Sequence, residues 1–278
     1  MSERTSGGAT ELRRAPHRWR VSGSWLAVLV AIVLVAVVAA ALGPHNADFY
    51  QLWVYFDPQT GEEQYQNLRV DLFMALTSGF FWNQFVALFL GVFLASRLRG
   101  ISRALVAAVP AGMLLAAVNL AVAWQVSADT RRRLDWWSEN ASATFPTDLL
   151  AEDGFQRVLA AGLAGYPLAA IAGVGLGTLV APMLRASTVA NTLLAVVATV
   201  TYGGFTMIVG GWVATADYEP VALLAGLALL PPAPVTPAVV RTALGDHGDA
   251  FTVAMLVGNV VWATVLIAAG RLVDARRA

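Results

Sequence analysis

Long apolar runs alternate with polar segments along the chain, and this pattern predicts a helical membrane protein. A helix needs about 20 apolar residues to cross a hydrocarbon core of roughly 30 Å, and each run is close to that length. We therefore expect an all-α integral membrane fold with six transmembrane helices, in a single domain over residues 24–278 that follows a polar segment over residues 1–23. The predicted spans cover residues 25–42, 72–95, 104–124, 158–184, 189–213 and 251–270.

Two apolar stretches allow a different interpretation. The run 25–42 follows an arginine-rich flank, as the core of a secretory signal peptide does. Its eighteen uncharged residues are too many for such a core, and we favour a retained span. Residues 221–230 are too few to cross a membrane, so we expect a re-entrant or interfacial helix between the fifth and sixth spans.

The two polar segments 43–71 and 125–156 are rich in acidic and aromatic residues and are predicted to be outer loops. The aromatic residues between positions 50 and 56 suggest a short amphipathic helix at the outer membrane interface. Within the spans, Pro110 is expected to kink the third span or unwind its first turn. Gly173, Gly175 and Gly177 give the fourth span a small-residue surface. Because glycines four apart share one helix face, another helix is expected to approach there closely.

The distribution of charge predicts the orientation. The chain is 58% apolar and 13% charged, which is a membrane composition, and all 18 basic residues are arginine. With both termini inside, the cytoplasmic segments carry twelve arginines and three acidic residues, and the outer loops carry six and fifteen. The positive-inside rule therefore places both termini in the cytoplasm. Arg131–Arg133, in an outer loop, are a local exception.

Several kinds of chemistry are excluded by residue type. Without lysine the chain has no P-loop, and without cysteine it has no thiol chemistry. No predicted span carries an Asp, Glu or Arg near its centre, which argues against a proton relay. The spans also lack a Ser/His or paired-Asp arrangement. We therefore expect no enzymatic activity, no metal and no bound cofactor.

The polar residues inside the predicted spans are amides and hydroxyls. They are expected either to form hydrogen bonds between helices, worth about 0.6 kcal/mol each, or to line a pathway for an amphipathic or lipid-like substrate. They are Asn83, Gln84, Asn119, Asn191, Thr201, Tyr202 and Asn259.

Three stretches of the second half resemble the permease subunits of type-2 ABC exporters. Phe155–Tyr166 with the glycine-rich run that follows resembles the fourth span of that family, and Met183–Ala190 resembles the cytoplasmic turn before its fifth span. Leu229–Val235, together with Trp262 and Ala269–Arg277, resembles the outer re-entrant segment and the basic tail. The first half departs from the family at residues 96–103, where an acidic coupling stretch is replaced by a short basic turn.

The resemblance implies a partner that carries the ATP and Mg²⁺, a separate nucleotide-binding ATPase subunit. It also implies a second copy or homologue of the permease, with membrane lipids around the pair, and we expect no nucleic-acid partner. The location implied is a bacterial plasma membrane, and the lysine-free, alanine- and arginine-rich usage is typical of a high-GC genome. Candidate contacts to the ATPase are Arg13, Arg14, Arg18, Arg97, Arg99 and Arg103.

Other interpretations stay open at this point. The same arginines also fit a role as topology anchors and lipid headgroup partners. A non-catalytic scaffold or assembly subunit would hold a partner with the acidic, aromatic outer loops. A secondary transporter of two inverted three-span halves would have the same number of spans.

Overall fold

The computed structural model describes residues 23–42, 62–98, 100–140, 153–180, 192–193, 195–201 and 248–276. In these ranges the chain is helical and contains no strand, which confirms the all-α fold. The helices are α1 (Gly23–Leu42), α2 (Glu62–Arg97), α3 (Ile101–Val126), α4 (Ala128–Asn140), α5 (Asp153–Val180) and α9 (Gly248–Ala275), with short helical pieces over residues 192–193 and 195–201.

Among the described residues, three helices have the length and composition to cross a membrane. They are Ile101–Val126, Leu159–Val180 and Leu256–Val273, and they coincide with the predicted third, fourth and sixth spans. Helix α1 coincides with the first predicted span, and α2 contains the second. Most of the span at 189–213, the segment at 221–230 and the basic segment 1–23 lie outside the described residues.

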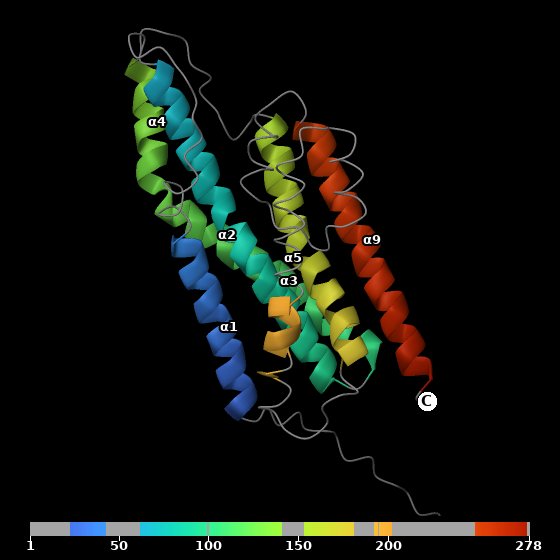
Figure 1. Ribbon diagram of the computed structural model, residues 1–278. Helices are drawn as coiled ribbons and strands as arrows, with labels where there is room; N and C mark the ends of the chain where they lie inside the picture. The colour runs from blue at the N-terminus through green and yellow to red at the C-terminus, as the bar shows by residue number, and fades with distance from the viewer. Residues whose placement is uncertain are drawn as a thin grey trace, which may run out of the picture.

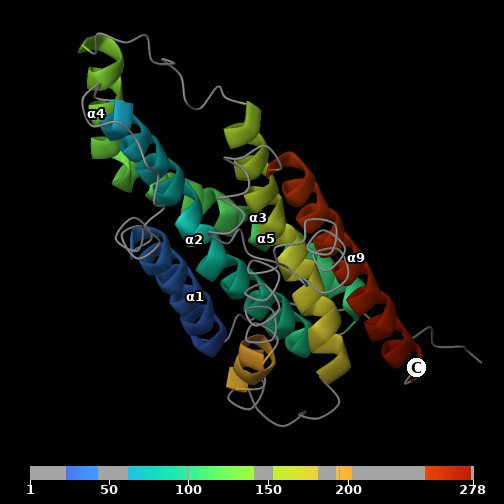
Figure 2. The same cartoon turned by 45° about the horizontal axis from the view of Figure 1, so that its top comes forward.

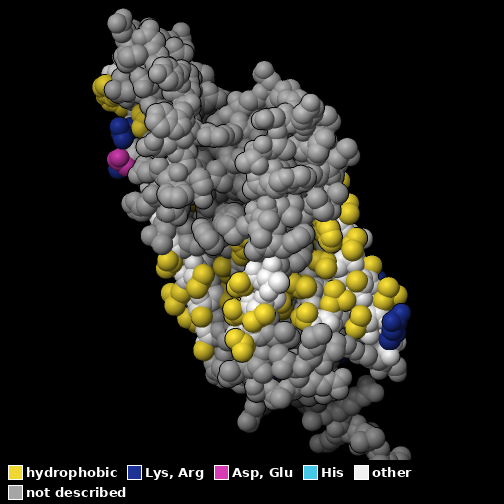
Figure 3. Space-filling model, in the orientation of Figure 1, with side chains coloured by type: hydrophobic (Ala, Val, Ile, Leu, Met, Phe, Trp, Pro, Cys, Tyr) yellow, Lys and Arg dark blue, Asp and Glu magenta, His cyan; other side chains and the backbone are white. Residues whose placement is uncertain are grey.

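The outer surface of the bundle is apolar, as expected for a protein in contact with lipid. Large hydrophobic side chains point outward from α1, α3 and α9, among them Val106, which is 77% exposed. Figure 3 shows hydrophobic side chains in a broad band over the described part of one face, with arginine side chains towards its two ends and an acidic side chain at one of them. This distribution supports a membrane-embedded molecule.

Helix α5 lies at the centre of the described bundle and packs against α2, α3 and α9 (Figure 1). Helix α1 lies against α2 and α3 on the side away from α9. The core between these helices mixes alanine with leucine, isoleucine and valine, and Leu88, Ala170 and Val174 are fully buried. The fold also depends on close contact between helix backbones.

The glycines of α5 explain this close contact. A Cβ atom at Gly173 would collide with the Leu88 carbonyl oxygen of α2, and one at Gly177 would lie 2.7 Å from the Val92 carbonyl oxygen. These two glycines therefore share the face towards α2, as their spacing of four predicts. Gly175 points elsewhere, because its Cβ would lie 2.5 Å from the Leu266 carbonyl carbon of α9.

Helix α3 runs without a break from Ile101 through Pro110, so the predicted unwinding of its first turn is wrong. A proline removes only one hydrogen bond of the helical ladder, and the exposed ring of Pro110 needs no space inside the bundle. Helix α3 comes close to α5 nearby. A Cβ at Gly112 would stand 2.9 Å from Cα of Pro167, a second proline inside a helix.

The two polar segments are partly helical, although the sequence predicted no helix over residues 62–71 or 128–140. Helix α2 begins at Glu62, ten residues before the predicted span, and α4 occupies residues 128–140. At 1.5 Å per residue the 36 residues of α2 reach about 54 Å, well beyond a hydrocarbon core of about 30 Å. The start of α2 and helix α4 lie side by side (Figure 2), and both contribute a leucine to the core, Leu68 and Leu134.

A single residue, Ser127, separates α3 from α4. Its N–H donates to the Ala123 carbonyl at 3.0 Å, and its own carbonyl accepts the N–H of Arg131 at 3.0 Å. The Ser127 hydroxyl donates to the Trp124 carbonyl at 3.1 Å, a local bond that often bends helices. Helical hydrogen bonding thus continues from the span into α4, which fixes α4 rigidly to α3.

Candidate functional site

A buried polar cluster lies where α2, α3 and α5 meet beside α1. It consists of Asn83 and Gln84 on α2, Asn119 on α3 and Tyr166 on α5. Each of the four side chains is at most 2% exposed. Neutral polar groups in an apolar bundle are costly to bury unless they find hydrogen-bond partners, so the partners of each decide what the cluster does.

Asn83 joins three helices. Its Nδ2 donates to the Asn119 side-chain oxygen on α3 and to the Ala36 carbonyl oxygen on α1, the latter at 3.0 Å. The Tyr166 side chain on α5 lies beside Asn83. One amide therefore connects α2 to α1 and α3, with Tyr166 of α5 beside it.

Gln84 adds a second connection between α2 and α5. Its Nε2 donates to the Gly162 carbonyl oxygen at 3.0 Å. Gly165 makes room for the side chain, because a Cβ there would stand 2.8 Å from Cδ of Gln84. The sequence Gly162 to Tyr166 thus receives the two amides of α2 on one face of α5.

Part of the hydrogen-bonding capacity of the cluster is unused. Within the described residues, Oδ1 of Asn83, Oε1 of Gln84 and Nδ2 of Asn119 are buried and have no hydrogen-bond partner. A buried donor or acceptor without a partner costs about 1–3 kcal/mol, so water or a polar ligand group is expected to complete the site. The chemistry available is binding by neutral donors and acceptors, since the four side chains include no carboxylate, imidazole or amine.

The remaining predicted polar residues are placed elsewhere or lie outside the described part. Asn259 is 5% exposed on α9, and Thr201 is exposed at the end of the helical piece 195–201. Asn191 and Tyr202 fall outside the described residues. Three of the seven predicted residues, Asn83, Gln84 and Asn119, are therefore brought together.

Tyr166 is the member of the cluster that residue type alone did not single out. A tyrosine inside an apolar run is a usable signal, because a buried hydroxyl normally needs a partner. The small residues before it, including Gly162 and Gly165, also indicate a place where another helix or side chain comes close.

Of the arginines proposed to contact an ATPase, Arg97 has the most informative surroundings. It lies in the last turn of α2, partly exposed, with its guanidinium carbon 5.9 Å from the centre of the Phe93 ring. Its Nε and Nη2 atoms are buried and make no hydrogen bond in the described part of the chain. Arg103 is exposed in the first turn of α3, and Gly100 with φ of 92° allows the tight turn between the helices. Arg13, Arg14, Arg18 and Arg99 lie outside the described residues.

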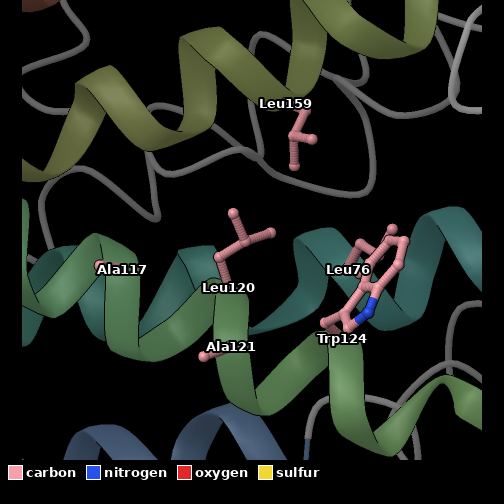
Figure 4. Close-up of a pocket in the computed structure, with 6 residues that line it drawn as sticks. All are labelled: Leu76, Ala117, Leu120, Ala121, Trp124 and Leu159. Carbon is pink, nitrogen blue, oxygen red and sulfur yellow. The ribbon is translucent and has the colours of Figure 1, made fainter.

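A separate apolar groove of about 430 Å³ lies between α2, α3 and α5 (Figure 4). In the close-up, Leu120 of α3 points towards Leu159 of α5, and the ring of Trp124 lies beside Leu76 of α2. The guanidinium of Arg131 stacks 3.8 Å from the centre of the Trp124 ring. One end of the groove is therefore marked by the guanidinium of Arg131, which stacks on the indole ring of Trp124.

The described residues contain no group of three or more His, Asp or Glu side chains suited to hold a metal ion. No protein-family model, curated protein or solved structure matches the chain. The functional interpretation therefore depends on the polar cluster, on the helix-end arginines and on the groove.

Proposed function

We propose that the chain is the permease subunit of an ABC exporter in a bacterial plasma membrane. It forms the membrane pathway for an amphipathic or lipid-like substrate, and a separate subunit hydrolyses ATP. In this proposal six spans place both termini in the cytoplasm, and the turn between α2 and α3 faces the ATPase. The neutral polar cluster fits transport without proton coupling, because none of its four side chains changes charge near neutral pH.

The observation that carries the proposal is the state of Arg97. A guanidinium always carries its charge, and here Nε and Nη2 have no acceptor within the described residues. The contact with Phe93 compensates only part of that charge, since cation–π contacts at such sites are worth about 0.5–2 kcal/mol. Because Nε and Nη2 are buried in the isolated chain, docking of a subunit would have to shift the Arg97 side chain before a carboxylate reaches them, and the exposed Arg103 would extend the same contact.

Co-purification tests the proposal. The tagged full-length chain is expected to carry a stoichiometric P-loop ATPase through purification in mild detergent. Arg97→Ser is expected to lower the recovered ATPase about tenfold, the effect of one lost charge-assisted hydrogen bond. Arg132→Ser is the matched control, because Arg132 already pairs with Asp129 at 3.3 Å on the exposed side of α4, and this variant should keep the ATPase. A stable preparation that contains no ATPase would contradict the proposal.

A membrane scaffold is the second candidate, and the arm formed by α4 and the start of α2 favours it. Helix α2 is longer than a membrane span, so this arm is expected to project from the membrane. The arm exposes Trp136, whose side chain is 56% exposed. A scaffold would hold a partner on this arm without ATP. The two candidates separate in the same co-purification, since a partner that is lost in Trp136→Ala and kept in Arg97→Ser would identify the scaffold.

A further inference from the structure

The apolar groove has the dimensions of a binding site. Its volume of about 430 Å³ lies within the roughly 300–1,000 Å³ typical of small-molecule sites. From Ala117 to Trp124 it follows α3 for seven residues, which is about 10 Å at the helical rise. A groove of this length would cross most of one leaflet, because each leaflet is half of a hydrocarbon core about 30 Å thick. All six lining residues are apolar or aromatic, so the interior suits a hydrocarbon chain.

One end of the groove is marked by an ordered cation. Trp124 occupies the last turn of α3, where aromatic residues typically mark the membrane boundary. Arg131 lies over its ring and donates from Nη2 to the Trp124 carbonyl oxygen at 2.9 Å. A guanidinium has five N–H groups that can donate hydrogen bonds. In the described part of the chain, only the bond to the Trp124 carbonyl uses one of them. Its Nε is buried without a partner.

Among the described residues, Arg131 has no acidic partner. The nearby Asp129 pairs with Arg132, its neighbour at three residues along α4, at 3.3 Å. Within the described residues no acidic side chain pairs with Arg131. The arginine distribution also places this segment on the outer side of the membrane, so the orientation of the chain gives no reason for a cation here.

We propose that the groove binds one acyl chain of an anionic phospholipid whose phosphate is held by Arg131. The planar guanidinium offers two parallel N–H groups to a phosphate, and its stacking on Trp124 fixes the geometry before the lipid arrives. The net negative charge of the headgroup supplies the missing counterion, which a zwitterionic headgroup does not. This site goes beyond the proposed transport role and does not depend on an ATPase partner.

Quenching of Trp124 by brominated lipid tests the site. The full-length chain is reconstituted in phosphatidylcholine vesicles that contain an equal fraction of either phosphatidylglycerol or phosphatidylcholine with dibrominated acyl chains. The Trp124 signal is the difference between the wild type and Trp124→Phe. Brominated phosphatidylglycerol is expected to quench this signal at about tenfold lower lipid fraction than brominated phosphatidylcholine, the difference of one charge-assisted contact.

Three variants separate the parts of the site. Arg131→Ser should abolish the preference for phosphatidylglycerol, and Arg133→Ser, with the same charge change at an exposed position of α4, should keep it. Ala121→Phe fills the groove and should remove quenching by both lipids while Arg131 stays in place. Equal quenching of the wild type by both lipids, no quenching by either, or a preference that survives in Arg131→Ser would each overturn the proposal. None of these results depends on ATPase recovery, so failure of this site and failure of the permease proposal are distinguishable.

Discussion

The amide of Asn83 illustrates how one polar residue organises several helices. Its donor group serves both an α1 carbonyl and the Asn119 side chain, while the acceptor oxygen of the same amide has no partner among the described residues. A single uncharged side chain therefore holds α1 and α3 to α2, in a bundle whose helices otherwise meet largely through apolar residues. In a membrane the hydrophobic effect does not drive helices together, so such bonds and close packing carry the association.

A double-mutant cycle on Asn83 and Asn119 measures this connection. The free energy of unfolding in detergent is expected to fall in Asn83→Ala and in Asn119→Ala, with a coupling of about 0.6–1.7 kcal/mol between the two changes. Thr264→Ala is the control, because the exposed Thr264 hydroxyl donates only to the Val260 carbonyl of its own helix. A coupling near zero would mean that the bond between the two amides does not contribute to the fold.

The sequence alone identified most members of the polar cluster as candidates. It could not predict which of them lie together in the folded chain. Amides inside apolar runs stand out, and Asn83, Gln84 and Asn119 are found this way. Which of them converge depends on the rotation of each helix and on its neighbours, and neither is encoded in the spacing within one helix. Tyr166 required the same knowledge, since its position against Asn83 follows only from the packing of α5 on α2.

At the scale of helices, the α2–α5 interface is the tightest contact that the glycines describe. A Cβ added at Gly91 would collide with the Ala170 carbonyl oxygen, and one at Gly173 would collide with the Leu88 carbonyl oxygen. Because both obstacles are backbone atoms, they move only if a whole helix moves. The contact therefore fixes the distance between α2 and α5 and holds the polar cluster in register.

Gly173→Ala is expected to lower the free energy of unfolding by about 1–3 kcal/mol, as overpacking does. Gly270→Ala is the matched control on α9, because its Cβ would stand 3.2 Å from the Cβ of Thr178 and 3.3 Å from the Gly175 carbonyl oxygen, a smaller overlap than at Gly173. Thermal unfolding of the two variants in the same detergent gives the comparison. A loss in Gly173→Ala no greater than in Gly270→Ala would argue against a tight α2–α5 contact.

Helix positions within the apolar runs could be predicted because twenty apolar residues have few alternatives in a membrane. The helices outside those runs were missed for a physical reason. Residues 62–71 and 128–140 are polar, and they become stable helices through each other and through Leu68 and Leu134, which join the core from a distance in sequence. The sequence of a polar segment does not show which other segment will pack against it. The helix of an apolar run can be predicted without that knowledge, because the membrane itself favours a helix there.

At the scale of the whole molecule, the described helices form one bundle with two functional ends. One end carries the α4 arm and the Arg131 end of the groove, and the other carries the turn between α2 and α3 with Arg97 and Arg103 (Figure 1). The polar cluster lies between them on the same helices. In the permease proposal, ATPase contact at the turn is transmitted along α2, which spans the full distance between the two ends.

The central claim, that an ATPase docks at the turn between α2 and α3, is tested most directly by cross-linking in membranes. Because the chain has no cysteine, Ser102→Cys introduces a unique thiol beside Arg103 and leaves every arginine in place. A thiol-directed photo-cross-linker at this position is expected to give an adduct with an ATP-binding protein, while Glu139→Cys, exposed on α4 at the other end, gives none. Absence of an ATP-binding adduct at Ser102→Cys, or the same adduct at Glu139→Cys, would contradict the account.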